Sequence, residues 1–465
     1  MITFYNTLKR KKNIFMPLKE GEVRMYTCGL TVYDRGHIGN FRTFIFEDIL
    51  RRYLEYKGYK VIQVMNITDV DDKTIKGAME TGKSLREYTE YYTDLFFKDI
   101  DILNIERAEY YPRATEHIND MVELIKVLLK KGVAYESKGS IYFRISEFPE
   151  YGKLSGLDNK SLIDGYRVDS DEYEKKNVKD FVLWKAPKEG EPYWDTELGP
   201  GRPGWHVECS VMSMKYLGET FDIHAGGVDL IFPHHENEIA QSEAATGKPF
   251  VNYWLHSEHL IIEGEKMSKS KGNFYIVNDL IKKGIEPVTL RYLLMSVHYR
   301  KKLNFTSTSI LQAKEAVDRI INFKLRLMTE VLKEGFQSDR VVSLLEKTKN
   351  GFDNAMDDDL NISEALASVF ELIRQVNILI DDNELTKNDA ELILSYLKRF
   401  DKVLGIIFVG KDEIADNEIL PLLEERNRAR KERNFQRADE IRNYLLEKGI
   451  ILEDTKTGTR WKRKV

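Results

Sequence analysis

The chain has 465 residues, of which 42% are hydrophobic and 32% charged, and its formal net charge is −5. A chain of this length predicts about two to four domains. It contains no apolar run of about 18 residues that could cross a membrane, and its N-terminus lacks the order of a secretory signal. The two cysteines, Cys28 and Cys209, exclude a disulfide framework and fit a reducing compartment, so we expect a cytoplasmic protein.

The first informative stretch is 28–40, which follows an apolar segment at 23–27 and precedes a helical pattern that begins near Phe41. A strand, a glycine-broken turn and a helix in this order form a phosphate site, because a helix start offers free N–H groups and a positive dipole end. The spacing fits neither a dinucleotide fingerprint nor a P-loop. The turn therefore predicts a nucleotide site of another kind, built around His37.

A second strand is predicted at 59–67, and a polar turn after it begins the next helix. This order favours a parallel sheet with right-handed crossovers, in which ligands bind beyond the carboxyl ends of the strands. Cys28 and Thr68 both follow such ends. We interpret the acidic cluster Asp69, Asp71 and Asp72 as a solvated helix cap and not as a metal site.

The middle of the chain is predicted to be helical over 84–132 and to form a hairpin over 134–143. We interpret 110–200 as an insertion into the α/β domain. The apolar run 181–185 is expected to resume the parallel pattern. A rigid Gly/Pro loop at 199–204 then leads into a helix that begins at Trp205 and carries Cys209 on its first turns.

A strand at 221–224 and a helix start near Pro233 complete a set of candidate metal ligands. Two thiols, an imidazole and a carboxylate suit zinc, and the favoured set is Cys28, Cys209, His234 and Glu238. His234 and Glu238 are four residues apart and share a helix face. From the residues alone, His206, His224 and His235 remain alternatives for the imidazole.

The stretch 265–273 predicts a mobile polar loop in which Lys266 and Lys269 could meet a polyphosphate. From about Pro287 onward the chain turns helical, with apolar positions at helical spacing over 310–330, 361–380 and 386–408. The cluster Asp357, Asp358 and Asp359 is interpreted as a helix-start or loop charge cluster.

The C-terminal segment 424–465 holds 13 Lys and Arg against 8 Asp and Glu, a surplus of five positive charges in an acidic chain. Its arginines at spacings of 4, 3 and 4 predict a basic stripe on one helix face, formed by Arg426, Arg430, Arg433 and Arg437. Trp461 lies among basic residues, which is typical of base stacking. A solvated amphipathic helix with a basic tail is the alternative.

Together, His37–Asn40 and 266–270 resemble the HIGH and KMSKS signatures of class I aminoacyl-tRNA synthetases. We call these stretches the HIGH turn (37–40) and the KMSKS loop (265–273). Three further motifs resemble the cysteinyl-tRNA synthetase family within that class: the segment 26–33, Pro-Gly-Trp-His-x-Glu-Cys at 203–209 and Phe-Pro-His-His-Glu-Asn-Glu at 232–238. Asn40 departs from the signature, which would place a histidine there.

The resemblance implies a ligase that activates L-cysteine with ATP and transfers it to the 3′ end of tRNA-Cys. It implies one zinc on Cys28, Cys209, His234 and Glu238, which takes the substrate thiol, and a cysteine pocket lined by Thr31 and Trp205. ATP, with Mg²⁺, would be held by His37, Gly39, Asn40, Gly226, Gly227, Asp229, Lys266 and Lys269. Of these, His37, Asn40, Lys266 and Lys269 would be the catalytic residues.

The expected architecture is an α/β, Rossmann-like catalytic domain at 1–110 and 200–285, with a connective insertion at 110–200. A stem-contact and helical-bundle region at 286–410 and a basic anticodon-binding module at 411–465 would follow. The family's habit implies a monomer. The rival hypotheses are a ligase that passes cysteine to an amino-sugar, a nucleotidyltransferase of the same superfamily, and a non-catalytic RNA-binding protein.

Overall fold

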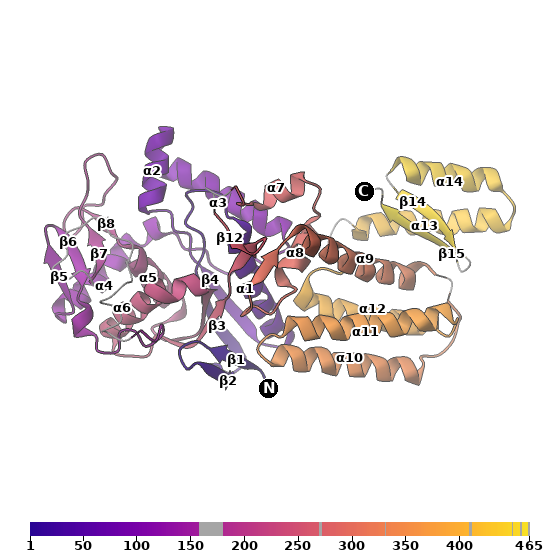
Figure 1. Cartoon of the computed structure of the whole chain (residues 1–465), viewed down its shortest axis with the longest axis horizontal. Coiled ribbons are helices and arrows are strands. Elements are labelled where there is room, and N and C mark those ends of the chain that lie inside the picture. The colour runs from indigo at the N-terminus through magenta and orange to yellow at the C-terminus, as the bar shows by residue number, and fades with distance from the viewer. Residues whose placement is uncertain are drawn as a thin grey trace. The chain divides into compact units, whose positions relative to one another are not determined.

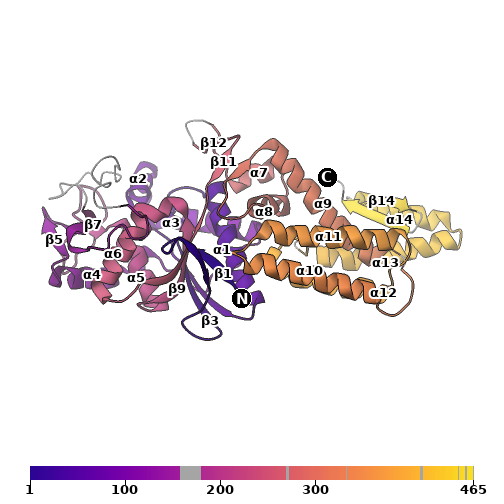
Figure 2. The same ribbon diagram turned by 60° about the horizontal axis from the view of Figure 1, so that its bottom comes forward.

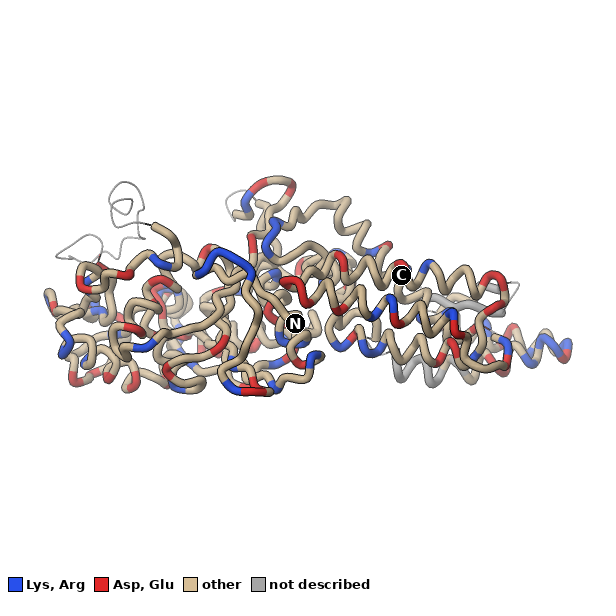
Figure 3. Tube along the Cα trace, turned by 90° about the horizontal axis from the view of Figure 1, so that it is seen from below, with Lys and Arg blue, Asp and Glu red and all other residues tan. Residues whose placement is uncertain are grey.

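The chain folds into two compact units (Figure 1). The computed structural model describes residues 1–157, 180–268, 272–330, 332–408, 412–448, 450–455 and 458–463. Unit 1 comprises Met1–Ile285, Val297–Phe305 and Asp358–Leu360, and unit 2 comprises Glu286–Ser296, Thr306–Asp357 and Asn361–Val465. Charges of both signs are spread over both units (Figure 3).

A four-stranded parallel sheet of order β10-β9-β3-β4 forms the centre of unit 1. Its strands are β3 (Glu22–Thr27), β4 (Lys60–Met65), β9 (Phe221–Gly227) and β10 (Val251–Ser257). Every residue of β9 is buried, as expected of a parallel strand that is covered on both faces. The predicted α/β class and the predicted strands at 23–27, 59–67 and 221–224 are confirmed.

In unit 1 one helix connects the parallel strands β3 and β4 and another connects β9 and β10, as parallel pairing requires. The helices of this unit are α1 (Ile38–Tyr56), α2 (Asp72–Thr81), α3 (Leu85–Ile102), α4 (Ile118–Lys130), α5 (Trp205–Leu217), α6 (Glu236–Thr246) and α7 (Val277–Lys282). Asp71 caps α2 by accepting a hydrogen bond from Lys73 N at 2.9 Å, which confirms the capping interpretation for this residue. The expectation that the turn is solvated is wrong for Asp69, which is 3% exposed and accepts hydrogen bonds from Thr115 N and Oγ1 at 2.9 and 2.6 Å.

The expectation that 181–185 resumes the parallel sheet is wrong. This segment is β7 (Phe181–Lys185), which pairs antiparallel with β6 (Ser140–Phe143) and β8 (Arg202–Pro203) in a separate sheet. The predicted hairpin is confirmed, since β5 (Ala134–Ser137) pairs antiparallel with β6. A short apolar run that is buried throughout has no periodicity that could distinguish the two sheets.

Two smaller strand pairings border the central sheet. The N-terminal strands β1 (Thr3–Asn6) and β2 (Lys11–Ile14) form an antiparallel pair. Strand β11 (Leu260–Ile262) pairs antiparallel with β12 (Glu265–Lys266) and parallel with β13 (Leu303–Phe305). The KMSKS loop therefore begins on a hairpin that is attached to unit 1.

Unit 2 is predominantly helical, as predicted, and α10 and α11 pack side by side (Figure 2). Its described elements are α8 (Pro287–Met295), α9 (Ser307–Thr329), α10 (Asp339–Asp357), α11 (Ile362–Asp381), α12 (Lys387–Leu404), α13 (Asp412–Lys431), α14 (Phe435–Glu447), β14 (Ile450–Thr455) and β15 (Gly458–Arg463). Leu345, Phe352, Val369 and Phe400 are among its fully buried core side chains.

The predicted arginine stripe is wrong in its geometry. Arg433 lies between α13 and α14 with a positive φ of 60°, and Asn434 caps α14 by accepting a hydrogen bond from Arg437 N at 3.2 Å. The helix therefore breaks inside the spacing pattern, and Arg437 lies on a different helix from Arg426 and Arg430. Asn434 is a residue type favoured at helix N-caps, and it could have indicated that a new helix begins after it.

Candidate functional site

The HIGH turn lies where the central sheet meets the start of α1. His37 is the N-cap: its Nδ1 accepts a hydrogen bond from Asn40 N at 3.2 Å, and its own N donates to Asn40 Oδ1 at 3.0 Å. Because Nδ1 accepts, a neutral His37 ring carries its proton on Nε2. The first turn of α1 holds no acidic residue, so the positive end of this helix is suited to an anion.

The segment that leads into the HIGH turn is fixed at several points. Gly29 N donates to Asn66 Oδ1 at 2.9 Å, and a Cβ on Gly29 would overlap the carbonyl oxygen of Asn66, so only glycine fits there. Arg35 donates to Asp99 Oδ1 at 3.1 Å. Burial raises the pKa of the Asp99 carboxyl to about 6, although Arg35 acts in the opposite direction.

The two signatures, far apart in the sequence, lie side by side in unit 1. Ile38 N donates to Tyr275 O at 3.0 Å, and the His37 ring meets the Phe274 ring edge-on with centroids 5.4 Å apart. A Cβ on Gly39 would lie 3.2 Å from Met267 Cε. Lys266 is exposed on β12 beside this contact, whereas Lys269 lies outside the described residues.

The predicted nucleotide residues Gly226, Gly227 and Asp229 lie at the carboxyl end of β9. A Cβ on Gly226 would lie 3.0 Å from both His235 Cε1 and Leu230 Cδ1, so a larger residue would crowd the floor of the site. A Cβ on Gly227 would lie 3.7 Å from Thr43 Oγ1 on α1, which places this strand end beside the helix that carries the HIGH turn.

The four favoured metal ligands come together in one buried cluster. The ligand atoms of Cys28, Cys209, His234 and Glu238 all lie within 4.8 Å of one another. They come from the end of β3, from α5, and from the start of α6 with the residues just before it. His234 Nε2 lies 3.0 Å from Glu238 Oε1, as their spacing on one helix face predicts.

Charge within this cluster favours the metal-binding protonation state of Cys209 and Glu238 only. Burial and Cys209 raise the pKa of the Cys28 thiol well above its usual range. Burial opposes protonation of His234, but Glu238 and Cys209 raise its pKa to about 10, so a metal must displace protons from both Cys28 and His234. Burial opposes ionisation of Cys209, but a hydrogen bond from the Cys28 thiol and the neighbouring His234 lower its pKa to about 6. Burial likewise opposes ionisation of Glu238, but His224 and His234 lower its pKa to about 2. A thiolate and a carboxylate are thus available near neutral pH, as a divalent metal requires.

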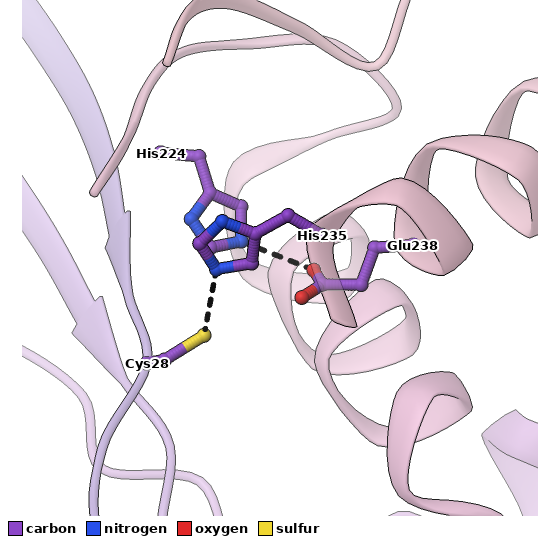
Figure 4. Close-up of side chains that lie close together, drawn as sticks. All are labelled: Cys28, His224, His235 and Glu238. Carbon is purple, nitrogen blue, oxygen red and sulfur yellow. Dashed lines mark hydrogen bonds and ion pairs between the residues drawn. The ribbon is translucent and has the colours of Figure 1, made fainter. Parts of the chain in front are cut away.

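A second set of four, Cys28, His224, His235 and Glu238, also has its ligand atoms within 4.8 Å (Figure 4). His235 Nε2 lies 3.4 Å from Cys28 Sγ, and His224 Nε2 lies 3.0 Å from Glu238 Oε2. Both sets offer donor types that zinc accepts, and only the first contains both thiols, so we take the first as the ligand set. His224 and His235 then orient its Cys28 and Glu238.

The buried cluster includes more imidazoles in mutual contact than the sequence predicts. His206 Nδ1 lies 2.9 Å from His234 Nδ1, so His206 contacts a candidate ligand without belonging to either set. His235 Nδ1 lies 2.8 Å from Nε2 of His256, a residue that the sequence analysis did not consider. His256 lies near the end of β10 and pairs with Gly226 in the register. Its position at the end of a parallel strand could have indicated that it lies near the site.

The two residues expected to line a cysteine pocket lie at different places in unit 1. Trp205 is 37% exposed and stacks on His234 with ring centroids 4.2 Å apart, so it covers the metal cluster from outside. Thr31 forms a parallel bridge with Thr68, beyond the ends of β3 and β4. Both residues lie at the edge of the sheet where the parallel strands end, as the metal cluster does.

The candidate tRNA-binding residues whose side chains the structure describes differ in exposure. Arg426 is 3% exposed, and the exposed Arg437 pairs with Glu425 at 2.8 Å and Glu440 at 3.1 Å. Trp461 lies on β15 opposite Leu452, but its side chain is outside what the structure describes. Within the described part of the chain, no helix is long and apolar enough to cross a membrane.

Comparison with known protein families finds three matches that together cover most of the chain. Residues 14–315 match the class I (C) tRNA synthetase catalytic domain, residues 351–409 the DALR domain, and residues 416–461 the cysteinyl-tRNA ligase anticodon-binding domain. The first match alone covers more than half of the chain.

Curated relatives match over the full length. The cysteine–tRNA ligase of Solibacter usitatus is 53% identical over 468 residues, covering 100% of both chains. That of Brachyspira hyodysenteriae is 52% identical over 473 residues, covering 100% of this chain and 99% of its own.

Solved structures share the fold at low identity. Methionyl-tRNA synthetase of Mycobacterium tuberculosis in complex with methionyl-adenylate superposes with a TM-score of 0.60 at 15% identity, covering 83% of this chain and 88% of its own. The LeuRS–tRNA–LeuAMS complex of Agrobacterium radiobacter has a TM-score of 0.60 at 10% identity, covering 84% of this chain and 85% of its own.

Proposed function

This chain belongs to the cysteine–tRNA ligase family of class I aminoacyl-tRNA synthetases, and from that premise we propose how its residues carry out the reaction. The enzyme activates L-cysteine with ATP, forming cysteinyl-adenylate and releasing pyrophosphate. It then transfers cysteine to the 3′ end of tRNA-Cys. Catalysis of this kind depends on positioning and on stabilisation of charge, with little covalent chemistry by the protein.

The buried four-ligand cluster fits one zinc ion. Two thiols, one imidazole and one carboxylate within 4.8 Å of one another match the donor types of this metal. When bound, zinc supplies a soft Lewis acid that accepts a thiol as thiolate and accepts a hydroxyl poorly, so it selects cysteine over serine. Trp205 and Thr31 line the pocket and limit the size of the side chain that enters.

The start of α1 holds the phosphates of ATP, which enters with Mg²⁺. His37 donates from Nε2, while its Nδ1 is occupied by the cap to Asn40. Gly39 leaves room for the nucleotide, and Lys266 and Lys269 neutralise the charge that develops on the triphosphate as the cysteine carboxylate attacks the α-phosphorus.

The other border of the nucleotide site is the end of β9. Gly226 and Gly227 let the nucleotide approach the strand closely, and the Asp229 carboxylate accepts hydrogen bonds from the ribose hydroxyls. Asn40 supports the site through its cap to His37.

The remaining parts of the chain serve the tRNA. We assign the catalytic domain to 1–110 and 200–285, the connective insertion to 110–200, the stem-contact and bundle region to 286–410, and anticodon recognition to 411–465. In the last module, Arg430, Arg433, Arg437 and Trp461 are the residues we expect to meet RNA, with Arg426 supporting them from inside. The enzyme acts as a monomer in the cytoplasm.

The observation that carries this assignment is the pair of thiols in one buried four-ligand cluster, in the same unit as the adjoining HIGH turn and KMSKS loop. ATP–pyrophosphate exchange without tRNA tests it, with cysteine, serine and alanine compared in separate reactions. We expect exchange with cysteine to exceed that with serine by more than the roughly 200-fold that a pocket achieves by size alone. A cysteine-to-serine ratio below that bound would argue against selection by the metal, and silence with every amino acid would argue against adenylation.

A further inference from the structure

A turn from the helical half of the chain is built into the catalytic unit. Asp358–Leu360 connect α10 to α11, yet they belong to unit 1. Asp359 N donates to Thr3 O at 2.9 Å, and Thr3 and Asp358 form a parallel bridge. Asp359 and Leu360 have positive φ angles of 61° and 53°, a conformation that non-glycine residues keep only where their surroundings fix it.

The Asp359 carboxylate is fully buried and receives four donors. Oδ1 accepts from Tyr5 N at 2.8 Å and from Tyr299 Oη at 2.5 Å, and Oδ2 accepts from Arg300 Nε at 2.7 Å and Nη2 at 2.6 Å. His298 Nε2 lies 3.7 Å from Oδ2. A buried carboxylate with this many donors fixes the backbone that carries them.

That backbone holds helix α1. Val297 O and His298 O accept from Nη2 of the buried Arg42 at 2.8 and 3.1 Å. The Tyr299 ring stacks on Phe46 with centroids 4.3 Å apart and planes 11° apart, and Tyr299 O accepts from Glu258 N at 2.8 Å. Arg42 and Phe46 both lie on α1, whose N-terminus is the HIGH turn.

We propose that Asp359 is a positioning residue for adenylate formation: through Tyr299 and residues 297–298 it holds α1, and with it His37, in register with the nucleotide site. This proposal rests on the proposed function, because α1 matters to the rate only if its N-terminus holds ATP. A shift of about 1 Å in such a group can cost about 100-fold in rate. The acidic cluster at 357–359 is interpreted from the sequence as a helix-start or loop charge cluster. One of its residues, Asp359, is instead buried and fixes the surrounding backbone.

The test compares Asp359→Asn with Asp358→Asn in cysteine-dependent pyrophosphate exchange. Asp358 is the matched control, because its side chain is 57% exposed and pairs with Lys12 at the surface. Rates are normalised to active sites by the burst of adenylate. We expect Asp359→Asn to lower kcat about 10- to 100-fold and to raise KM for ATP, with KM for cysteine unchanged. A loss of folded protein alone would lower the active-site count and leave both constants as they are.

Tyr299→Phe provides a second test that keeps the stack on Phe46 and removes only the hydroxyl bound to Asp359. This variant tests the positioning role even if Asp359→Asn does not fold. We again expect a lowered kcat with an unchanged KM for cysteine. Wild-type kcat in either folded variant, relative to Asp358→Asn, would overturn the positioning role. A wild-type enzyme that is silent with cysteine would instead overturn the proposed function, and the role of Asp359 with it.

Discussion

Replacing Gly39 by Ala should slow adenylate formation and leave the stability of the fold nearly unchanged. The added Cβ would lie 2.9 Å from His37 Nδ1, whereas ordinary contact begins at 3.4 Å, so His37 must move by 3.4 − 2.9 = 0.5 Å. If the ring moves directly away from Asn40 N, the hydrogen bond that Asn40 N donates lengthens from 3.2 to about 3.7 Å, which is too long to persist.

Two effects of this substitution on stability oppose each other. Losing the cap costs about 1 kcal/mol, and alanine is favoured over glycine in a helix by up to about 1 kcal/mol. The melting temperature should therefore change by only a few degrees, on the order expected for a residual below 1 kcal/mol. The rate has no such compensation: if 1 Å costs about 100-fold, half of that displacement costs about 10-fold in kcat.

Pyrophosphate exchange with saturating cysteine and varied ATP measures the effect, with thermal melting on the same samples. The double variant Gly39→Ala/Met267→Ala is the control, because Met267 Cε also lies 3.2 Å from the added Cβ. We expect no recovery in it, since the flexible Met267 side chain can already move aside in Gly39→Ala, whereas the His37 ring can move only by losing its cap. Wild-type kcat and KM for ATP in Gly39→Ala would refute the reasoning.

Three further variants test the site. Cys209→Ser should lose zinc and cysteine-dependent exchange while the fold stays largely intact, and unchanged zinc content by elemental analysis would remove Cys209 from the ligand set. Lys266→Ala should lower kcat of exchange about 100-fold, the size of effect of one preorganised charge donor, with KM for cysteine unaltered; a wild-type kcat would exclude this role. The raised pKa of Asp99, about 6 through burial against the effect of Arg35, means that the folded state binds the proton more tightly than the unfolded state. The stability of the wild type relative to Asp99→Asn should therefore fall as pH rises from about 4 to 6 and stay level above. Thermal melting of both proteins across that range checks this, and a difference independent of pH would contradict it.

Some features could be predicted because their signals are local. Strands followed by helices at 23–67 show the period of buried strands and the spacing of helices, and both were found. The four-residue spacing of His234 and Glu238 predicts their common face, and the two side chains do meet there. The signatures at 37–40 and 265–273 indicated the class I synthetases, and the motifs at 26–33, 203–209 and 232–238 indicated the family, which the matching family models and full-length relatives confirm.

Other features could not be predicted, because they depend on which distant segments meet. Strand β7 has the composition of a central strand but pairs in another sheet. Any of four histidines could have completed the metal set on spacing alone, and the path of the chain before α6 brings His234 to both thiols and leaves His206 beside it.

The sequence by itself determined the family, the order of strands and helices, and the donor types for a zinc site, since these follow from residue identity and short-range spacing. The tertiary structure decided which donors meet, where the C-terminal helix breaks, and that Asp359 lies buried against Tyr5 and Tyr299, 354 and 60 residues away in the chain. Such contacts depend on backbone closure and packing over long separations, for which local propensity carries no signal.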